Sequence, residues 1–166
     1  MEKFNIAVID TTVSILDILY RNRDIQRFWV LEEIARAPYF AFLSVLHFKE
    51  SLGLRGDEHI MLMKRHFEQT LNETEHLEYM ESLGGADRFI DRLFAKSLVL
   101  VYYWAMVAYY AISPKNAYHI NMLVEEHAAH TYTKYLSLHE DGRIEQIRQD
   151  EIDHYNELKQ AMELFK

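Results

Sequence analysis

Residues 150–154 read Asp-Glu-Ile-Asp-His, which places Glu151 three positions before His154. The same Glu-x-x-His pattern occurs earlier in the chain, at Glu73 and His76. Side chains three residues apart lie on one face of an α-helix, so each pair can direct a carboxylate and an imidazole at the same point. Two such pairs favour a helical fold with a metal site inside it, provided that other helices supply the remaining ligands.

Long helices are predicted along the whole chain because residues that break helices are rare. The 166 residues include five Gly and two Pro, and the intervals between them are longer than ordinary strands. The absence of a linker-like segment favours one domain over residues 1–166. The predicted helices span residues 5–20, 24–52, 57–83, 87–112, 115–139 and 142–165. Residues suited to cap helix N-termini are Asp57, Asp87 and Ser113, the last followed by Pro114, and Asp141 with Gly142 predicts a short turn into the last helix.

Two further glutamates lie inside apolar stretches of predicted helices. Glu32 follows Phe-Trp-Val-Leu, and Glu125 follows Asn-Met-Leu-Val. A carboxylate in such a stretch needs a partner. Four helices that supply Glu, Glu-x-x-His, Glu and Glu-x-x-His match the ligand set of ferritin-like di-iron carboxylate bundles. We therefore expect an all-α fold, a ferritin-like four-helix bundle with two additional helices. The predicted metal ligands are Glu32, Glu73, His76, Glu125, Glu151 and His154.

The predicted ligand set favours two iron ions as the cofactor. Its four carboxylates balance the charge of two ferrous ions, and its two imidazoles leave positions open for oxygen. Manganese uses similar ligands and stays open as an alternative. The chain has no Cys, which excludes Cys-ligated zinc and thiol nucleophiles. The competing interpretation is that all six residues are ordinary solvated helix positions.

The other histidines show no comparable pattern. His127 and His130 are three residues apart and could form a separate zinc site, although a packing or supporting role is favoured. The histidines that lack a partner at ligand spacing, and that we expect at the surface or in grooves, are His47, His59, His66, His119 and His139.

Charge and hydropathy restrict the partners of the protein. Eighteen Lys and Arg against 26 Asp and Glu give a formal net charge of −8, which argues against a nucleic-acid partner. The N-terminal residues lack the apolar core of a secretory signal, so an intracellular location is expected. The apolar segment over residues 98–112 is shorter than the ~20 residues of a membrane-spanning helix.

Around the predicted ligands, the sequence resembles the alternative oxidases, the membrane-associated di-iron quinol oxidases, together with their plastid terminal oxidase relatives. The resemblance is carried by residues 27–32, 72–77, 113–133 and 150–154. Three features depart from the family pattern. His127 replaces the third residue of a Glu-Glu-Glu run, Tyr118 replaces a usual His, and the interval between Glu125 and Glu151 is about half the family's span.

The resemblance implies specific roles for several residues. The six residues named above would be the iron ligands, and Asn72 and Asp150 would orient the ligating imidazoles. Tyr132 would be the redox-relevant tyrosine beside the irons. The residues at positions associated with the quinol pocket are Arg27, Leu31, Ala128 and Thr131. The expected reaction is oxidation of quinol coupled to reduction of O₂ to water.

Contact with a membrane is expected because a quinol is lipophilic. A basic stripe, Arg88, Arg92 and Lys96, leads into the apolar segment 98–112, and the first helix presents an apolar face. Together these helices could form a monotopic membrane patch. The alternative is that segment 98–112 is a buried central helix or a dimer face, in a soluble cytoplasmic protein. A homodimer is the expected assembly.

Two other functions compete with the quinol oxidase. The first is a small di-iron oxygenase or hydroxylase that acts on another apolar substrate, since the short connection before the last helix could leave a more open pocket. The second is a non-catalytic iron-binding bundle, against which the tyrosine beside the site argues.

Overall fold

The computed structural model describes residues 1–165 and confirms the all-α fold, with no strand among these residues. The predicted helices are all present. Helix α1 begins at residue 2 rather than 5, and α5 ends at residue 136 rather than 139. The helices are α1 (Glu2–Leu19), α2 (Asp24–Ser51), α3 (His59–Ser82), α4 (Phe89–Ile112), α5 (Pro114–Leu136) and α6 (Gly142–Glu163).

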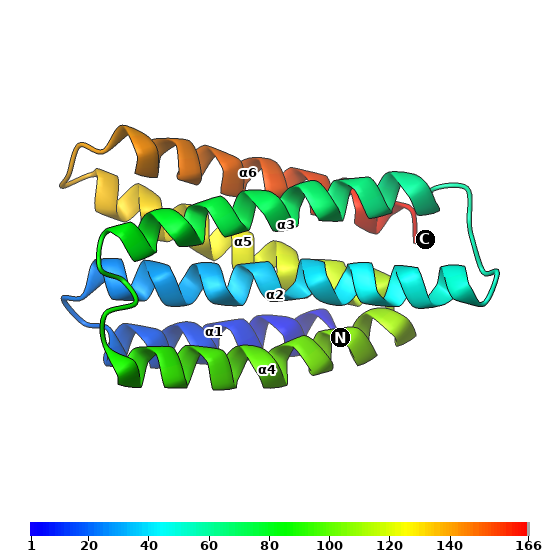
Figure 1. Cartoon of the computed structure of the whole chain (residues 1–166), viewed down its shortest axis with the longest axis horizontal. Coiled ribbons are helices and arrows are strands. Elements are labelled where there is room, and N and C mark those ends of the chain that lie inside the picture. Colours follow the sequence, from blue (N-terminus) through cyan, green and yellow to red (C-terminus); the bar gives the residue numbers. More distant parts are fainter. Residues whose placement is uncertain (166) are drawn as a thin grey trace.

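The helices run along a common long axis, as Figure 1 shows. Helices α2, α3, α5 and α6 form a four-helix bundle, held mainly by the packing of α5 on α6 and of α2 on α3. Helices α1 and α4 lie on one side of this bundle, where α1 packs on α5 and α4 packs on α2. This arrangement is the expected bundle with two additional helices.

The apolar core forms two clusters along the bundle. One cluster includes Trp29 and Ile147, and the other includes Phe42 and Leu158. On α3 and α6, the predicted metal ligands lie between residues of the two clusters. Apolar side chains therefore close the bundle on both sides of the candidate site and keep water away from it.

None of the three predicted side-chain caps is present, whereas Asp141, predicted only as a turn residue, caps α6. Asp141 Oδ1 accepts hydrogen bonds from the backbone N–H groups of Arg143 at 2.9 Å and Ile144 at 3.0 Å. The predictions for Asp57 and Asp87 are wrong, because α3 and α4 begin two residues later than expected and leave these residues outside the capping position. Ser113 occupies the cap position of α5, with Pro114 next to it, but makes no side-chain cap.

Helix α4 is exposed rather than central, which excludes the buried-helix interpretation of segment 98–112. Only 17% of its most apolar 18-residue window is buried. Residues such as Leu100, Val101 and Trp104 are more than half exposed. The helix has 24 residues and a mean hydropathy of 1.3 over that window, so by length and composition alone it could cross a membrane. The prediction that this region is too short is therefore wrong.

Candidate metal centre

The six predicted ligands come together inside the four-helix bundle. Helix α2 supplies Glu32, α5 supplies Glu125, and α3 and α6 each supply a Glu-x-x-His pair. All six side chains are buried. The competing interpretation, in which these residues are solvated helix positions, therefore does not hold.

The ligand atoms form two overlapping groups. Glu32, Glu73, His76 and Glu151 make one group, and Glu73, Glu125, Glu151 and His154 make the other. Within each group the candidate ligand atoms lie within 4.8 Å of one another. Because two glutamates are common to both groups, they are placed to bridge two ions, while each ion would gain one further carboxylate and one imidazole.

Both histidines direct Nδ1 at the carboxylates. His76 Nδ1 lies 3.1 Å from Glu151 Oε1, and His154 Nδ1 lies 2.8 Å from Glu73 Oε1. The other ring nitrogen of His76, Nε2, contacts Asp150 Oδ2 at 3.1 Å, which holds the ring in this orientation.

Asp150 is the supporting residue that the sequence resemblance implies. Burial acts to raise the pKa of its carboxyl group, but hydrogen bonds from His76, Gln146 and Asn72 outweigh burial and lower the pKa. Asp150 is therefore placed as a charged hydrogen-bond partner for the ring of His76.

Unpaired polar atoms are concentrated at this site. Both oxygens of Glu73 and of Glu151 are buried without a hydrogen-bond partner, as are the Nδ1 atoms of His76 and His154. One oxygen each of Glu32 and Glu125 is also unpaired. Burying such groups is costly unless they are paired or bind a metal. Two divalent cations would satisfy these atoms, so the residues present fit a two-metal centre.

The carboxylates favour proton binding when no cation balances their charge. Burial and neighbouring carboxylates raise the pKa values of Glu73 and Glu151 well above 4.5, and burial raises that of Glu125. Burial lowers the pKa of His76, but its hydrogen bond to Asp150 and the nearby carboxylates of Glu32 and Glu73 raise it overall, to about 10. Metal ions would displace these protons, so we expect metal affinity to increase with pH.

Two tyrosines donate hydrogen bonds to the carboxylates. Tyr132, which the sequence resemblance identifies as redox-relevant, is buried and donates to Glu32. Tyr39 donates to Glu125 Oε1 at 2.7 Å and was not predicted. Its spacing of seven residues from Glu32 is a signal that could have placed it on the same face of α2.

An apolar cavity of about 240 Å³ lies beside the centre, between α1, α2, α4 and α5. Leu31 and His127 line it, whereas Ala128 is buried in the adjacent apolar core. His127 Nε2 contacts Arg27 at 3.2 Å and Thr131 Oγ1 at 3.3 Å. The residues associated with the quinol pocket therefore gather at this cavity, either in its wall or against a residue of its wall.

The environment of His127 differs from that of a metal ligand. Burial, together with the charge of Arg27, lowers the pKa of His127 to about 4. Among the described residues, no metal-binding group includes His127 or His130, so the separate zinc site is not supported.

Two of the histidines expected at the surface or in grooves are buried, although His59 also lines a cavity with Leu46 and Tyr110, as the expectation of a groove allows. His66 is fully buried and makes hydrogen bonds to Gln69 Oε1 at 2.9 Å and Tyr118 Oη at 2.8 Å. His59 is 4% exposed and lies 3.7 Å from Glu50. Hydrogen bonds satisfy both ring nitrogens of His66, whereas Nε2 of His59 has no hydrogen-bond partner, and no sequence spacing predicts either environment. Of the remaining three residues of that set, His47 and His139 are exposed, and His119 is partly buried.

Fold and site together define an all-α bundle protein whose buried carboxylates and histidines could hold metal ions. The chain belongs to the alternative oxidase family, since the family model described as "Alternative oxidase" matches residues 1–163. This match confirms the resemblance seen in the sequence.

Curated relatives agree with this family. The chain is 46% identical over 134 residues to "Ubiquinol oxidase 4, chloroplastic/chromoplastic" of Arabidopsis thaliana, covering 80% of this chain and 37% of the relative. It is 29% identical over 147 residues to "Ubiquinol oxidase, mitochondrial" of Mangifera indica, covering 89% and 45%. The chain thus spans less than half the length of these relatives. No solved structure shows a significant match.

Proposed function

We propose that this chain, as a single domain over residues 1–166, is a di-iron quinol oxidase that couples quinol oxidation to reduction of O₂ to water. The observation that carries the proposal is the pair of overlapping ligand groups that share Glu73 and Glu151. Membership of the alternative oxidase family supports the same reaction, and the relatives named ubiquinol oxidases indicate the substrate class.

The chain's own side chains would hold and orient the metal centre. Two iron ions, when bound, would supply the electron exchange between the substrate and oxygen. Asp150 fixes the ring of His76, and Tyr39 fixes the carboxylate of Glu125. Tyr132 holds a proton at its hydroxyl against Glu32, the position from which a redox-active tyrosine would act. The proposed iron ligands are Glu32, Glu73, His76, Glu125, Glu151 and His154.

The apolar cavity is the proposed quinol site. Its wall includes Leu31 and Val124, which directly precede the candidate ligands Glu32 and Glu125 in the sequence. A ring bound there would be adjacent to the metal centre, enclosed mainly by aliphatic side chains. His127 supplies a polar group in the wall, supported by Arg27 and Thr131 outside the cavity lining.

A lipid surface is the proposed source of the quinol. Helix α4 exposes apolar residues such as Leu100 and Trp104, and α1 exposes Phe4 and Ile18. Both helices line the cavity, so a lipid layer against them would lie next to it. The basic stripe contributes less to membrane binding than expected, because Lys96 forms an ion pair with the buried Glu33.

Trp104 offers a direct test of membrane contact. The chain has two Trp, of which Trp29 is buried and Trp104 is 62% exposed. Phosphatidylcholine vesicles should shift the fluorescence of Trp104 to shorter wavelength and should leave a Trp104→Phe variant unshifted. If the emission wavelength of the native protein does not change at vesicle concentrations that fully bind an amphipathic control peptide, the monotopic arrangement is contradicted.

A homodimer is the proposed assembly. Helix α3 exposes Ile60, Phe67 and Leu71, which lie along one helical stripe. A second copy of the chain could cover this stripe. We expect light scattering to give twice the chain mass of 19.8 kDa, and Phe67→Lys to reduce it to the mass of one chain.

The reaction is tested by metal analysis and product analysis together. Reconstituted protein should contain two iron ions per chain, and Glu73→Ala should not retain both. With a short-chain quinol, the native protein should consume oxygen and release the quinone at the mass of the dehydrogenated substrate. A product that gains the mass of one oxygen atom would instead identify an oxygenase.

A further inference from the structure

One residue in the lining of the apolar cavity carries a hydroxyl group whose role is unassigned. The lining is mostly aliphatic, with residues such as Val8, Leu16 and Leu98, but it also includes Tyr102 from α4. The hydroxyl group of Tyr102 is buried and has no hydrogen-bond partner. A buried hydroxyl without a partner is costly, and a ligand oxygen that reaches it removes that cost.

The hydroxyl groups of the fully buried tyrosines are partnered. Tyr39 and Tyr132 donate to carboxylates of the metal centre, and Tyr110 and Tyr118 contact each other at 2.7 Å. Tyr102 is only partly buried as a residue, but its hydroxyl group is buried and, unlike these, has no partner. A buried hydroxyl without a partner in the ligand-free protein is expected of a group that hydrogen-bonds to a ligand.

The hydroxyl of Tyr102 lies within the electrostatic field of the candidate metal centre. Burial and the negative charge of Glu125 both raise the pKa of Tyr102, which places its hydroxyl within electrostatic reach of that candidate ligand. Val124, the residue before Glu125, lines the same cavity. A ligand oxygen bound to this hydroxyl would thus lie toward the centre, with the remainder of the ligand among aliphatic side chains.

We propose that the hydroxyl of Tyr102 donates a hydrogen bond to a ring oxygen of the quinol or quinone and so fixes its orientation in the cavity. This inference rests on the proposed function for the identity of the ligand. It assigns to α4 a substrate-binding residue additional to Arg27, Leu31, Ala128 and Thr131. The ligand class is an alkylated ring with at least one oxygen substituent.

The test compares two probes and two proteins by equilibrium binding to the metal-free chain, so that turnover plays no part. The probes are decylubiquinone and decylbenzene, which lacks the ring oxygens. The proteins are the native chain and Tyr102→Phe. Loss of one hydrogen bond should weaken binding of decylubiquinone by roughly threefold to tenfold. Decylbenzene should bind the variant as tightly as the native chain or more tightly.

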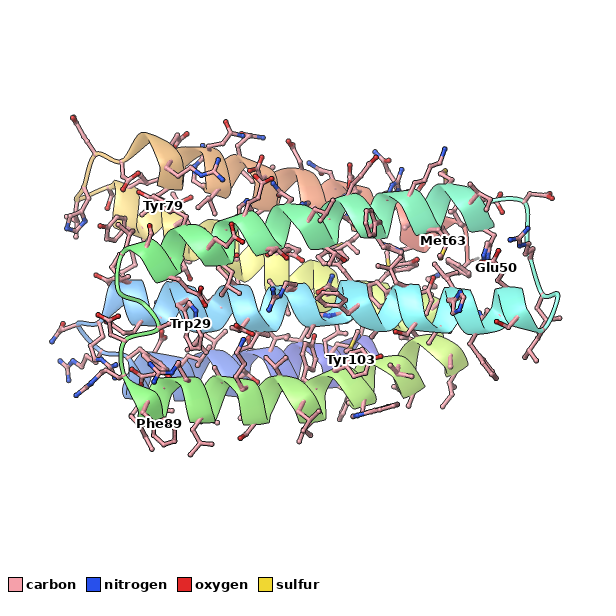
Figure 2. All side chains as sticks on the ribbon, in the orientation of Figure 1. Trp29, Glu50, Met63, Tyr79, Phe89 and Tyr103 are labelled. Carbon is pink, nitrogen blue, oxygen red and sulfur yellow. The ribbon has the colours of Figure 1, made fainter. Side chains whose placement is uncertain are left out.

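Tyr103 provides the matched control on the same helix. Figure 2 labels Tyr103 between α2 and α4, where its hydroxyl contacts Ser44 Oγ at 2.9 Å, outside the lining of this cavity. Tyr103→Phe should leave the affinity for both probes unchanged. Tyr102→Phe should also raise the melting temperature of the ligand-free protein, because it removes an unpaired buried hydroxyl.

The outcomes separate this inference from the proposed function. A selective loss of decylubiquinone binding in Tyr102→Phe supports the inference even if the loaded protein shows no oxidase activity. Equal weakening of both probes would mean that the substitution only disturbs packing, and it would overturn the inference. Unchanged affinity for decylubiquinone, or no binding of that probe to the native chain, would also overturn it.

Discussion

Replacing Glu151 with Gln should stabilise the metal-free protein and weaken its metal binding, two effects of opposite sign. Glu151 is buried, and neither of its carboxylate oxygens has a hydrogen-bond partner. Burial, followed by the charges of Glu73 and Glu32, raises its pKa well above the ordinary 4.5. The substitution keeps the shape of the side chain and removes its ability to ionise.

The direction of the stability change follows from proton binding in the folded and unfolded states. Because the pKa of Glu151 is higher in the folded chain, the folded metal-free protein keeps a proton that the unfolded chain releases above pH 4.5. The stability of the metal-free native protein therefore falls as the pH rises, by up to about 1.4 kcal/mol per pH unit. Glu151→Gln escapes this loss, so its advantage should be near zero at pH 4.5 and at most about 3 kcal/mol at pH 6.5.

Ferrous iron should reverse the order of stability. A ligand held at 100 times its Kd stabilises the folded state by about 2.7 kcal/mol, and the variant lacks one of the two shared carboxylates needed for this gain. Urea unfolding followed by circular dichroism, with chelator or with anaerobic iron, measures both effects.

The control for this experiment is Glu163→Gln, at an exposed position on the same helix. It should change the stability of neither the metal-free nor the iron-loaded protein. A metal-free Glu151→Gln protein that is no more stable than the native one at pH 6.5 would refute the claim that the carboxylates form a desolvated cluster.

Three other substitutions test the fold and the site. Gly85→Ala should destabilise the protein by about 1–3 kcal/mol in urea unfolding, because the added Cβ would lie 2.7 Å from Trp29 Cβ, whereas Gly142→Ala enters open space and should cost less. Asp141→Ala should cost about 0.5–2 kcal/mol in the same assay through loss of its cap, and an unchanged midpoint would contradict the capping role. Tyr132→Phe should retain iron by metal analysis and lose turnover, so normal oxygen uptake by that variant would disprove its redox role.

The sequence predicts the fold and the convergence of the ligands for simple geometric reasons. Sparse Gly and Pro leave long helices, and the i, i+3 spacing of each Glu-x-x-His pair places both side chains on one helix face. Glu32 and Glu125 stand out because charge inside an apolar stretch needs a partner. These signals are local in the sequence. Four helices that bury these side chains in one bundle must also bring the side chains together.

Other features depend on contacts between helices and leave no local signal. His66 is buried because Gln69 and Tyr118 satisfy its ring nitrogens, and Tyr118 comes from another helix. The caps assigned to Asp57 and Asp87 failed because a helix start can shift by two residues without changing its apolar pattern. The unpaired hydroxyl of Tyr102 becomes visible only once α1 and α4 enclose the cavity.

The positions of the candidate metal centre and the cavity explain why the bundle needs its two additional helices. The carboxylates are buried by α2, α3, α5 and α6, whose apolar clusters lie on both sides of them. Those four helices alone would leave Leu31 and Val124, next to two candidate ligands, open to water. Helices α1 and α4 cover this side and create the cavity between themselves and the bundle. Their outward apolar residues remain exposed, so the helices that form the proposed quinol site are also those suited to face lipid.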